Sequence, residues 1–416
     1  MSEHLNIGLF LKNSSDKNHI IEEILGNRFL RKFFDLCFLQ GGLYSSLSIN
    51  RFIDEELRHD HFIIQTDKNP GLYSMSSGER KKALLKYLIN QKPDFLILDD
   101  VYSNIDAETQ KSVTNDLIKL GKSILLIQIF FRKKDVLSCI NKVLTINENN
   151  KIVNEQSFHD FTRSDSLLEI DSHPVRIPRF YHNSIRLPSN LVELYSVSAS
   201  YGKKRVLNNI SWTIKKNEFW QLSGPNGSGK STLVSMLTGD NPFGYGQNII
   251  LFGRKKGTGE SIWDIKQKIG YFSPAMIHRF YHNDSVENMI VSGFKDSVGL
   301  YSRASNMQQD IANRWIELLN LKNGKQKFNQ LSTGRQRMVM VARAMVKHPP
   351  LLILDEPTIE LDDENSSLFV EMINAIRAEY STAIIYVSHR EEKGLKPDKI
   401  FELIPAAEGF TGKIHY

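Results

Sequence analysis

The sequence predicts an α/β protein built from two tandem copies of one domain, with the first copy contracted. The stretch "MSSGERKKALLKYLINQKPDFLILDD" (75–100) aligns without a gap with "LSTGRQRMVMVARAMVKHPPLLILDE" (331–356), which indicates an internal repeat. In both copies a short apolar run ends in two carboxylates, a pattern typical of a buried strand. We therefore expect domains at 1–155 and 190–416. A proline-broken linker at 156–189 would join them.

The composition is typical of a globular protein without a membrane span. The 416 residues are 41% hydrophobic and 24% charged, and the longest apolar run, "SILLIQIFF" (123–131), has the length of a strand. The N-terminal stretch lacks the pattern of a secretory signal, and the two cysteines, Cys37 and Cys139, favour a reducing compartment. We expect a cytoplasmic protein. The net charge of +6 leaves open a peripheral position on the inner face of the membrane, although a solvated basic surface explains it as well.

A glycine-rich stretch in the second copy predicts a phosphate-binding loop. "GPNGSGKST" (224–232) has the spacing G-x-x-x-x-G-K-[ST] and lies between a strand-like and a helix-like run. Glycines adopt positive φ readily, so successive backbone N–H groups can face phosphate oxygens, and the lysine can reach the β- and γ-phosphates. The predicted ATP-binding residues of this loop are Gly224, Pro225, Asn226, Gly227, Ser228, Gly229, Lys230, Ser231 and Thr232.

Five residues of the second copy are candidates for the chemistry of MgATP. Ser231 and Asp355 would hold Mg²⁺, and Glu356 would orient or deprotonate the attacking water. The apolar run "TAIIYVSH" ends in His389, which is suited to contact the γ-phosphate. Tyr201, upstream of the loop, could stack on adenine. A lone aromatic residue or strand-end histidine is more often structural, but the order of these residues along the chain favours a functional role.

The second copy resembles an ATP-binding cassette (ABC) ATPase, because the motifs of that family occur in family order across 190–416. Besides the loop and the carboxylates, these motifs are a signature-like "LSTGRQR" (331–337) and a D-loop "IELD" (359–362). The resemblance implies hydrolysis of ATP with Mg²⁺ as cofactor. It also implies that the Ser and Gly of each signature contact the γ-phosphate bound to the opposite cassette of a pair.

The second copy departs from the family pattern at three positions. Its signature has Thr333 for a Gly and Arg335 for the usual Gln or Glu. Pro274 stands about where the family carries the Q-loop Gln, which helps to hold Mg²⁺ and senses the coupled domain. Proline has no side-chain oxygen, so this role is vacant or has moved, for example to Ser273.

The first copy has lost the residues of its phosphate-binding loop. Lys17 remains at the lysine position, but the three glycines, the Mg²⁺-binding serine and the catalytic glutamate are replaced. An unrelated loop and helix at 11–27 would equally leave this copy without a working loop. In either case the first copy should not hydrolyse ATP. The replacing residues are Leu11, Ser14, Asp16, Asn18 and Asp100.

The first copy nevertheless keeps the better signature. "MSSGE" retains Ser76, Gly78 and Glu79, closer to the family pattern than "LSTGR". In the paired geometry of the family, the complete loop of the second copy would face this good signature, and the two eroded motifs would face each other. The loss of one loop thus coincides with the loss of the signature that would face it, which indicates that the two halves close on each other within one chain. A homodimer formed through the second copies remains an alternative.

The stretch 284–321 narrows the resemblance. Together with "YVSHREE", it is similar to soluble tandem cassettes of the molybdate-transport or photorepair ATP-binding (ModF) type. This similarity implies an ATP-binding component that lacks its own membrane domain and acts on a permease from another chain. No residue can be assigned to an oxyanion site, so molybdate itself is not predicted. The apolar stripe Ile311, Trp315, Leu318 and Leu319 within this stretch is most simply core.

Three hypotheses for the function stay open. The leading one is an ATPase with one competent site that passes mechanical work to a partner. The second is a cassette protein that acts on the ribosome or nucleic acid, favoured by the basic net charge but disfavoured by the lost loop. The third is a nucleotide sensor that binds ATP and rarely turns it over.

Overall fold

The computed structural model describes most of the chain. Three residues singled out in the sequence, Ser14, Cys37 and His389, lie outside the described residues. The described residues are 5–12, 15–33, 36, 39–64, 71–103, 105–164, 175–179, 187–277, 280, 283–300, 303–388 and 392–416.

The chain divides into two compact units. The first unit comprises Met1–Ile170 and Glu360–Asp363, and the second comprises Asp171–Ile359 and Glu364–Tyr416. No helix in the described part of the chain is long and apolar enough to cross a membrane.

A mostly parallel six-stranded sheet forms the centre of the first unit, in the order β2-β3-β4-β1-β5-β6. Strands β1 to β5 pair in parallel, and β6 is antiparallel to β5. In β1 the side chains alternate between two cores, with Ile7, Leu9 and Leu11 in one and Phe10 against the other. The strands are β1 Ile7–Leu11, β2 Gly41–Tyr44, β3 Phe95–Asp99, β4 Leu125–Phe130, β5 Lys142–Ile146 and β6 Ile152–Ser157.

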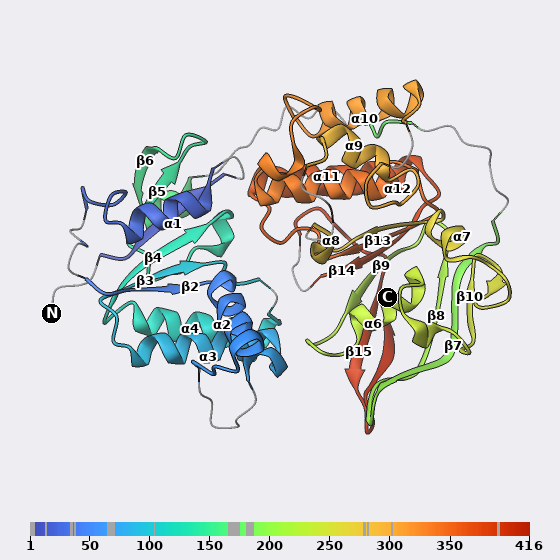
Figure 1. Cartoon of the computed structure of the whole chain (residues 1–416), viewed down its shortest axis with the longest axis horizontal. Helices are drawn as coiled ribbons and strands as arrows, with labels where there is room; N and C mark the ends of the chain where they lie inside the picture. Colours follow the sequence, from blue (N-terminus) through green and yellow to red (C-terminus); the bar gives the residue numbers. More distant parts are fainter. Residues whose placement is uncertain are drawn as a thin grey trace. The chain divides into compact units, whose positions relative to one another are not determined.

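Helices cover both faces of this sheet, with α1 on one face and α3 and α4 on the other (Figure 1). Each of the longer helices begins where a polar side chain accepts a hydrogen bond from the first turn: Asp16, Ser45, Ser76 and Asp106 are these N-caps. The helices are α1 Lys17–Leu25, α2 Ser46–His59, α3 Ser77–Asn90, α4 Ala107–Leu120 and α5 Phe158–Arg163, with short 3₁₀ turns at Leu72–Ser74 and Lys133–Asp135.

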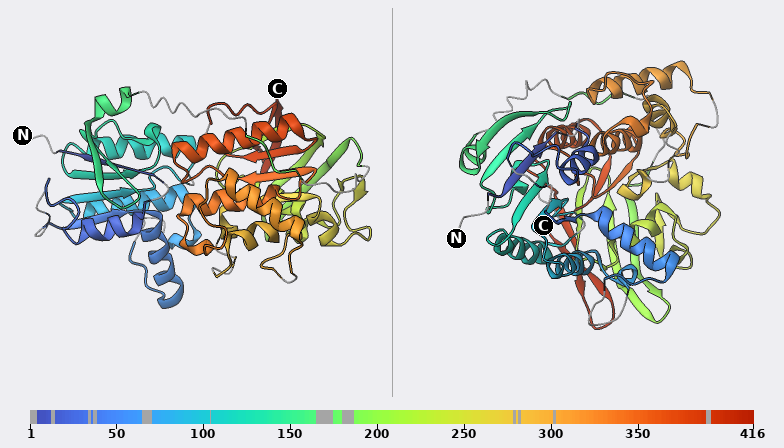
Figure 2. Two further views of the ribbon diagram at one scale, coloured as in Figure 1. Left: turned by 90° about the horizontal axis from the view of Figure 1, so that it is seen from above. Right: turned by 60° about the vertical axis from the view of Figure 1, so that its left-hand side comes forward.

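The second unit contains a ten-stranded sheet in the order β11-β10-β7-β8-β16-β15-β9-β14-β13-β12. Its long antiparallel strands β7 and β8 run beside the C-terminal pair β15 and β16, as the green and red ribbons of Figure 2 show. The strands are β7 Asn190–Tyr201, β8 Lys204–Lys215, β9 Phe219–Ser223, β10 Ile249–Leu251, β11 Arg254–Lys255, β12 Ile269–Phe272, β13 Leu351–Asp355, β14 Ala383–Val387, β15 Lys399–Pro405 and β16 Phe410–His415.

The two sheets confirm the internal repeat. The order β12-β13-β14-β9-β15-β16 in the second unit matches β2-β3-β4-β1-β5-β6 in the first, strand for strand and direction for direction. Strand β1 and helix α1 therefore hold the topological place of β9 and the helix after it, so 11–27 is the altered counterpart of the phosphate-binding loop. In the described part of the first unit nothing corresponds to the antiparallel strands β7, β8, β10 and β11.

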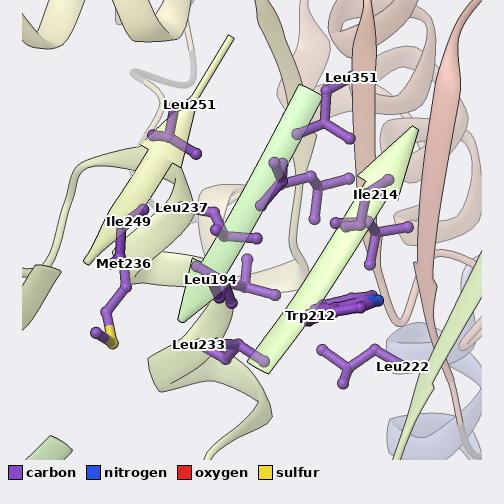
Figure 3. Packing of buried hydrophobic residues seen from close by; sticks show 14 of the residues in the cluster. Leu194, Trp212, Ile214, Leu222, Leu233, Met236, Leu237, Ile249, Leu251 and Leu351 are labelled. Atoms are coloured by element: carbon purple, nitrogen blue, oxygen red, sulfur yellow. The ribbon is translucent and has the colours of Figure 1, made fainter. Parts of the chain in front are cut away.

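One continuous core joins the parallel and antiparallel parts of the second unit. Figure 3 shows residues of the central strands and of α6 packed together, with Leu222 beside Trp212. The indole of Trp212 stacks on Phe401, with ring centroids 4.4 Å apart. The helices are α6 Lys230–Thr238, α7 Ile262–Lys266, α8 Pro274–Ile277, α9 Val286–Ser292, α10 Asn306–Leu318, α11 Thr333–Met345 and α12 Asp363–Glu379, with 3₁₀ turns at Pro242–Gly244 and Phe328–Gln330.

The start of the expected linker differs from the structure. Residues 156–163 complete β6 and form α5, whose Phe161 is buried in the core of the first unit beside Phe10 and Phe130. With only six residues, α5 is too short to show a helical period in the sequence. Of the apolar stripe predicted here, Ile311 and Trp315 of α10 and Leu319 directly after it are buried, whereas Leu318 is half-buried.

Candidate functional site

The predicted site residues of the second unit gather at one edge of the sheet. Strands β9, β14, β13 and β12 are parallel neighbours, and Leu222, Val387 and Asp355 are in register across three of them. The carboxyl ends of parallel strands meet at the same edge, which is where ligands of open α/β sheets bind. This edge therefore carries the glycine-rich loop after β9, the two carboxylates after β13 and Ser273 after β12.

The loop glycines adopt the positive φ that the sequence predicted. The φ angles are +141° at Gly224, +77° at Gly227 and +94° at Gly229. At two of them space is also restricted, because a Cβ on Gly224 would lie 2.8 Å from the carbonyl oxygen of Leu403, and one on Gly229 would lie 2.7 Å from Cδ2 of Leu207. Backbone angle and packing thus both require glycine at these two positions.

The first turn of α6 is open to an anion. Its N-cap, Gly229, has no side chain, so no side-chain oxygen accepts from the first-turn N–H groups. The hydroxyl of Ser228 is fully buried and has no hydrogen-bond partner among the described residues. An uncapped helix start, a glycine cradle and an orphaned hydroxyl together fit the phosphates of a nucleotide.

Lys230 and Asp355 provide the opposite charges that MgATP requires. The ammonium of Lys230 donates to the carbonyl oxygens of Gly224 at 2.7 Å and Pro225 at 3.0 Å, so it lies over the loop. Burial raises the pKa of Asp355 to about 6, and the charge of Lys230 opposes that shift. The described residues contain no cluster of three metal-binding side chains. The predicted Mg²⁺ ligands Ser231 and Asp355 supply oxygen atoms, which this hard cation prefers.

Glu356 is held in an uncommon backbone conformation. Its φ is +46°, and its N–H donates to the carbonyl oxygen of Val387 at 2.8 Å. This bond ties the start of the loop after β13 to the end of β14. His389 lies outside the described residues, two positions after Val387, and its proposed contact stays a prediction.

Tyr201 lies beside the first turn of α6, and its stacking on adenine stays a prediction. Its hydroxyl is 3.4 Å from Oγ1 of Thr232 and accepts from Nδ2 of Asn241 at 3.3 Å. Phe243 packs edge-on against its ring, and half of the side chain remains exposed. The sequence did not indicate these two supporting residues, because they follow α6 in an irregular segment.

The two signatures differ in how their helices begin. In the first unit Ser76 and Glu79 form a capping box, in which the backbone N–H of Ser76 donates to Glu79 at 2.9 Å and Glu79 N–H to Ser76 at 3.4 Å. In the second unit Arg335 stands at the glutamate position, and the side chain of Ser332 accepts no hydrogen bond from the first turn. Ser76 is exposed, whereas the hydroxyl of Ser332 is buried without a partner among the described residues.

In the first unit, side chains of the unit itself contact the groups that correspond to the phosphate-binding loop. Asp16 has φ −85° and accepts from the N–H of His19, so it caps α1 where α6 is open. The backbone thus avoids the positive φ that would have strained this residue. The ammonium of Lys17 lies 3.0 Å from the buried carboxylate of Asp99. Burial alone would lower the pKa of Lys17, but neighbouring carboxylates, Asp99 first, raise it above its ordinary value.

The carboxylate of Asp100, the counterpart of Glu356, is engaged in hydrogen bonds as well. It has φ +56°, and its carboxylate accepts hydrogen bonds from the hydroxyls of Ser46 at 3.1 Å and of Ser103. These two hydroxyls fix the orientation of the Asp100 carboxylate. The sequence revealed the shorter side chain, but these two hydroxyls come from distant segments and left no local signal.

Ser273 is positioned to replace the missing glutamine. It follows β12, whose Phe272 is in register with Leu354, so Ser273 lies next to the position of Asp355 on the neighbouring strand. It is 7% exposed, and Pro274 begins α8 directly after it. Proline is well suited to the first position of a helix. This explains the presence of Pro274 without assigning it a role in ligand binding.

Comparisons with known proteins agree with this fold. The family described as ABC transporter matches residues 207–359. The ABC transporter ATP-binding protein ModF of Escherichia coli is 34% identical over 333 residues, which cover 76% of this chain and 67% of that protein. An ABC transporter ATP-binding protein of Schizosaccharomyces pombe is 29% identical over 332 residues, 77% of this chain and 66% of its own length.

A solved structure resembles the whole chain in fold. It is the archaeal ribosome recycling factor aABCE1, in complex with the archaeal ribosomal stalk protein aP1. The similarity covers 99% of this chain and 85% of that one, with a TM-score of 0.59 and 14% sequence identity. At this low identity the comparison supports the fold, which is two cassettes in tandem. It does not indicate a shared role.

Proposed function

Because the chain belongs to the ABC transporter ATP-binding family and is an ATPase, we propose that it hydrolyses MgATP at one composite site made from both of its units. The second unit would contribute the loop at 224–232, Asp355, Glu356 and His389. The first unit would contribute Ser76 and Gly78 of its signature.

In this proposal each residue has a defined task. The loop N–H groups and Lys230 bind the β- and γ-phosphates, and Tyr201 stacks on adenine. Mg²⁺, held by Ser231 and Asp355, would neutralise charge between the β- and γ-phosphate oxygens. Glu356 accepts a proton from the water that attacks the γ-phosphorus, as the bond to ADP breaks.

The contrast between the two loops is the observation that carries the proposal. One loop has its positive-φ glycines, an uncapped helix and an orphaned hydroxyl, while the other is filled by Asp16 and by the Lys17–Asp99 ion pair. The signatures show the reverse contrast, since Ser76 is exposed on a capped helix and the hydroxyl of Ser332 is buried. Each unit thus offers the part that the other lacks, as a single shared site requires.

The proposal is tested by placing an arginine in each signature in turn. In steady-state assays Ser76→Arg should abolish ATP hydrolysis, because the bulky cation would lie at the γ-phosphate. Ser332→Arg should leave the rate within about twofold, and Lys230→Ala is the inactive control. If Ser332→Arg is the inactive variant, second units pair between chains instead. If the unmutated chain does not turn over at all, the sensor hypothesis replaces the ATPase.

The similarity to ModF, an ABC transporter ATP-binding protein of Escherichia coli, supports a transport role. We expect the chain to act with a permease supplied by another chain. Pull-down of the Glu356→Gln variant, held in its ATP-bound form, should then retain a membrane protein and release it when ATP is removed.

A role on the ribosome or on nucleic acid is the second candidate, and it is favoured by the net charge of +6. Under that hypothesis the same Glu356→Gln variant would sediment with ribosomes in the presence of ATP. Such retention should weaken steeply with salt, because contacts to phosphates release counterions.

A further inference from the structure

A buried hydrogen bond links the two loops that carry the proposed catalytic residues of the second unit. Oγ1 of Thr358 donates to Oε1 of Glu392 at 2.8 Å. Thr358 is 1% exposed and lies two residues after Glu356, in the loop between β13 and α12. Glu392 is 9% exposed and lies three residues after His389, in the segment between β14 and β15.

From this contact we infer that Glu392 is a positioning residue, which fixes the loop of Glu356 against the strand end of His389 through Thr358. The inference rests on the proposed roles of those two residues. The N–H of Glu356 already donates to Val387 at 2.8 Å, so the Thr358–Glu392 bond adds a second link between the same two segments. One link holds the backbone at Glu356, and the other holds the loop two residues beyond it.

The surroundings of the contact leave little room for the two loops to shift. Tyr386, the residue before Val387 in β14, is buried to 3% exposure. Burial, together with the negative charges of Glu392 and Glu356, raises the pKa of Tyr386 to about 12. In a dry environment a charge-assisted hydrogen bond is strong and directional.

The described counterpart residues of the first unit have other partners. Asp100 is instead held by the hydroxyls of Ser46 and Ser103 within its own strand edge. The residue that aligns with Thr358 is Tyr102, whose hydroxyl is 3.5 Å from Oγ1 of Thr114 in α4. The inter-loop bond therefore occurs in the unit that has the intact phosphate-binding loop.

The test removes the hydrogen bond and restores it. Thr358→Val and Glu392→Leu each lose one partner, and each should lower kcat about tenfold or more with the KM for ATP within about twofold. Thr358→Ser and Glu392→Gln keep a donor and an acceptor, and each should retain most of the rate. The double variant Thr358→Val/Glu392→Leu should be no slower than the slower single variant, because both changes break one link.

Thr382→Val is the matched control for stability. The buried hydroxyl of Thr382 donates to the carbonyl oxygen of Pro349 at 3.0 Å, at the opposite end of the same two strands. This variant should lower the melting temperature about as much as Thr358→Val and leave kcat unchanged. An equal loss of kcat in Thr382→Val, or no loss in Thr358→Val, would overturn the inference. Residual full activity in Glu356→Gln would overturn the proposed function and the inference with it.

Discussion

The residue directly before α6 in the second unit, and directly before α1 in the first, controls whether the helix start can bind phosphate. Gly229 has φ +94° and leaves the first turn of α6 open, whereas Asp16, at the same place in the first unit, has φ −85° and caps α1. A carboxylate at a helix start satisfies the N–H groups that phosphate would otherwise occupy. The residue type at this one position thus decides whether the first turn of the helix is capped or open.

Replacing the glycine should abolish nucleotide binding. Gly229→Ala puts a Cβ against Leu207 at a positive φ, which strains the loop by roughly 1–3 kcal/mol and moves it. We expect MgATP to stop raising the melting temperature of this variant. Gly246→Ala is the control, since Gly246 has φ +75° with open space around it and lies outside the loop. A normal MgATP shift in Gly229→Ala would contradict the assignment of the loop.

A buried lysine should make stability depend on alkaline pH. Lys347 donates to the carbonyl oxygen of Lys266 at 2.6 Å, and Asp296, 3.8 Å away, is already paired with Arg343. Burial lowers the pKa of Lys347 to about 8, below its value in the unfolded chain. Between these pKa values the unfolded state binds more protons, so this group's contribution to stability increases as the pH rises.

The effect is isolated by comparison with Lys347→Met. From pH 7.5 to 9.5 the free energy of unfolding of the unmutated chain should increase by about 1–2 kcal/mol relative to that of the variant. Urea titrations of both proteins at the two pH values measure this difference. Parallel pH profiles would mean that Lys347 titrates normally.

At the scale of the element, the signature helices α3 and α11 share a position but not a cap. Ser76 and Glu79 close the capping box of α3, while Arg335 prevents the same box at Ser332 in α11. The arginine also places a positive charge near the positive end of the helix dipole, which is unfavourable. The second signature is therefore weakened as a helix start as well as altered in sequence.

Arg335→Glu should restore the box. We expect this variant to stabilise the second unit by about 0.5–1 kcal/mol, visible as a melting temperature about 1–3 °C higher. Arg335→Ala serves as the control, because it removes the cation without supplying an acceptor for the N–H of Ser332. If both variants gain equally, the charge alone explains the difference.

At the scale of the whole molecule, the chain consists of two units with the same six-strand order and one complete phosphate-binding loop. In the first unit the places of phosphate and metal are taken by Asp16 and by the pairing of Lys17 with Asp99. Lys17 neutralises the buried carboxylate of Asp99, so this carboxylate does not need a metal ion or nucleotide to balance its charge.

The chain should accordingly bind one MgATP. Isothermal titration of the Glu356→Gln variant, which binds without turnover, should give a stoichiometry of one nucleotide per chain. Adding Lys230→Ala should remove this binding. Lys17→Met should leave it in place while destabilising the protein by up to about 3–5 kcal/mol, because Asp99 would remain buried without its partner. A stoichiometry of two would show that the first unit also takes nucleotide.

The sequence by itself determined the repeat, the α/β class and the second unit's loop and carboxylates. These features depend on local patterns: glycine spacing, short apolar runs and the gapless alignment of 75–100 with 331–356. Such patterns are visible in sequence because neighbouring residues impose the backbone angles and the burial that they need. Even the cap at Asp16 has a local signal, an Asp directly before a helical apolar period.

Only the tertiary structure decided which distant side chains meet. The pairing of Lys17 with Asp99 and the bond from Thr358 to Glu392 join segments that are separated by 82 and 34 positions. Parallel strands bring their carboxyl ends to one edge whatever the length of chain between them, so these contacts depend on strand order and register. No spacing rule in one sequence encodes that order, and it becomes visible only when the sheet is formed.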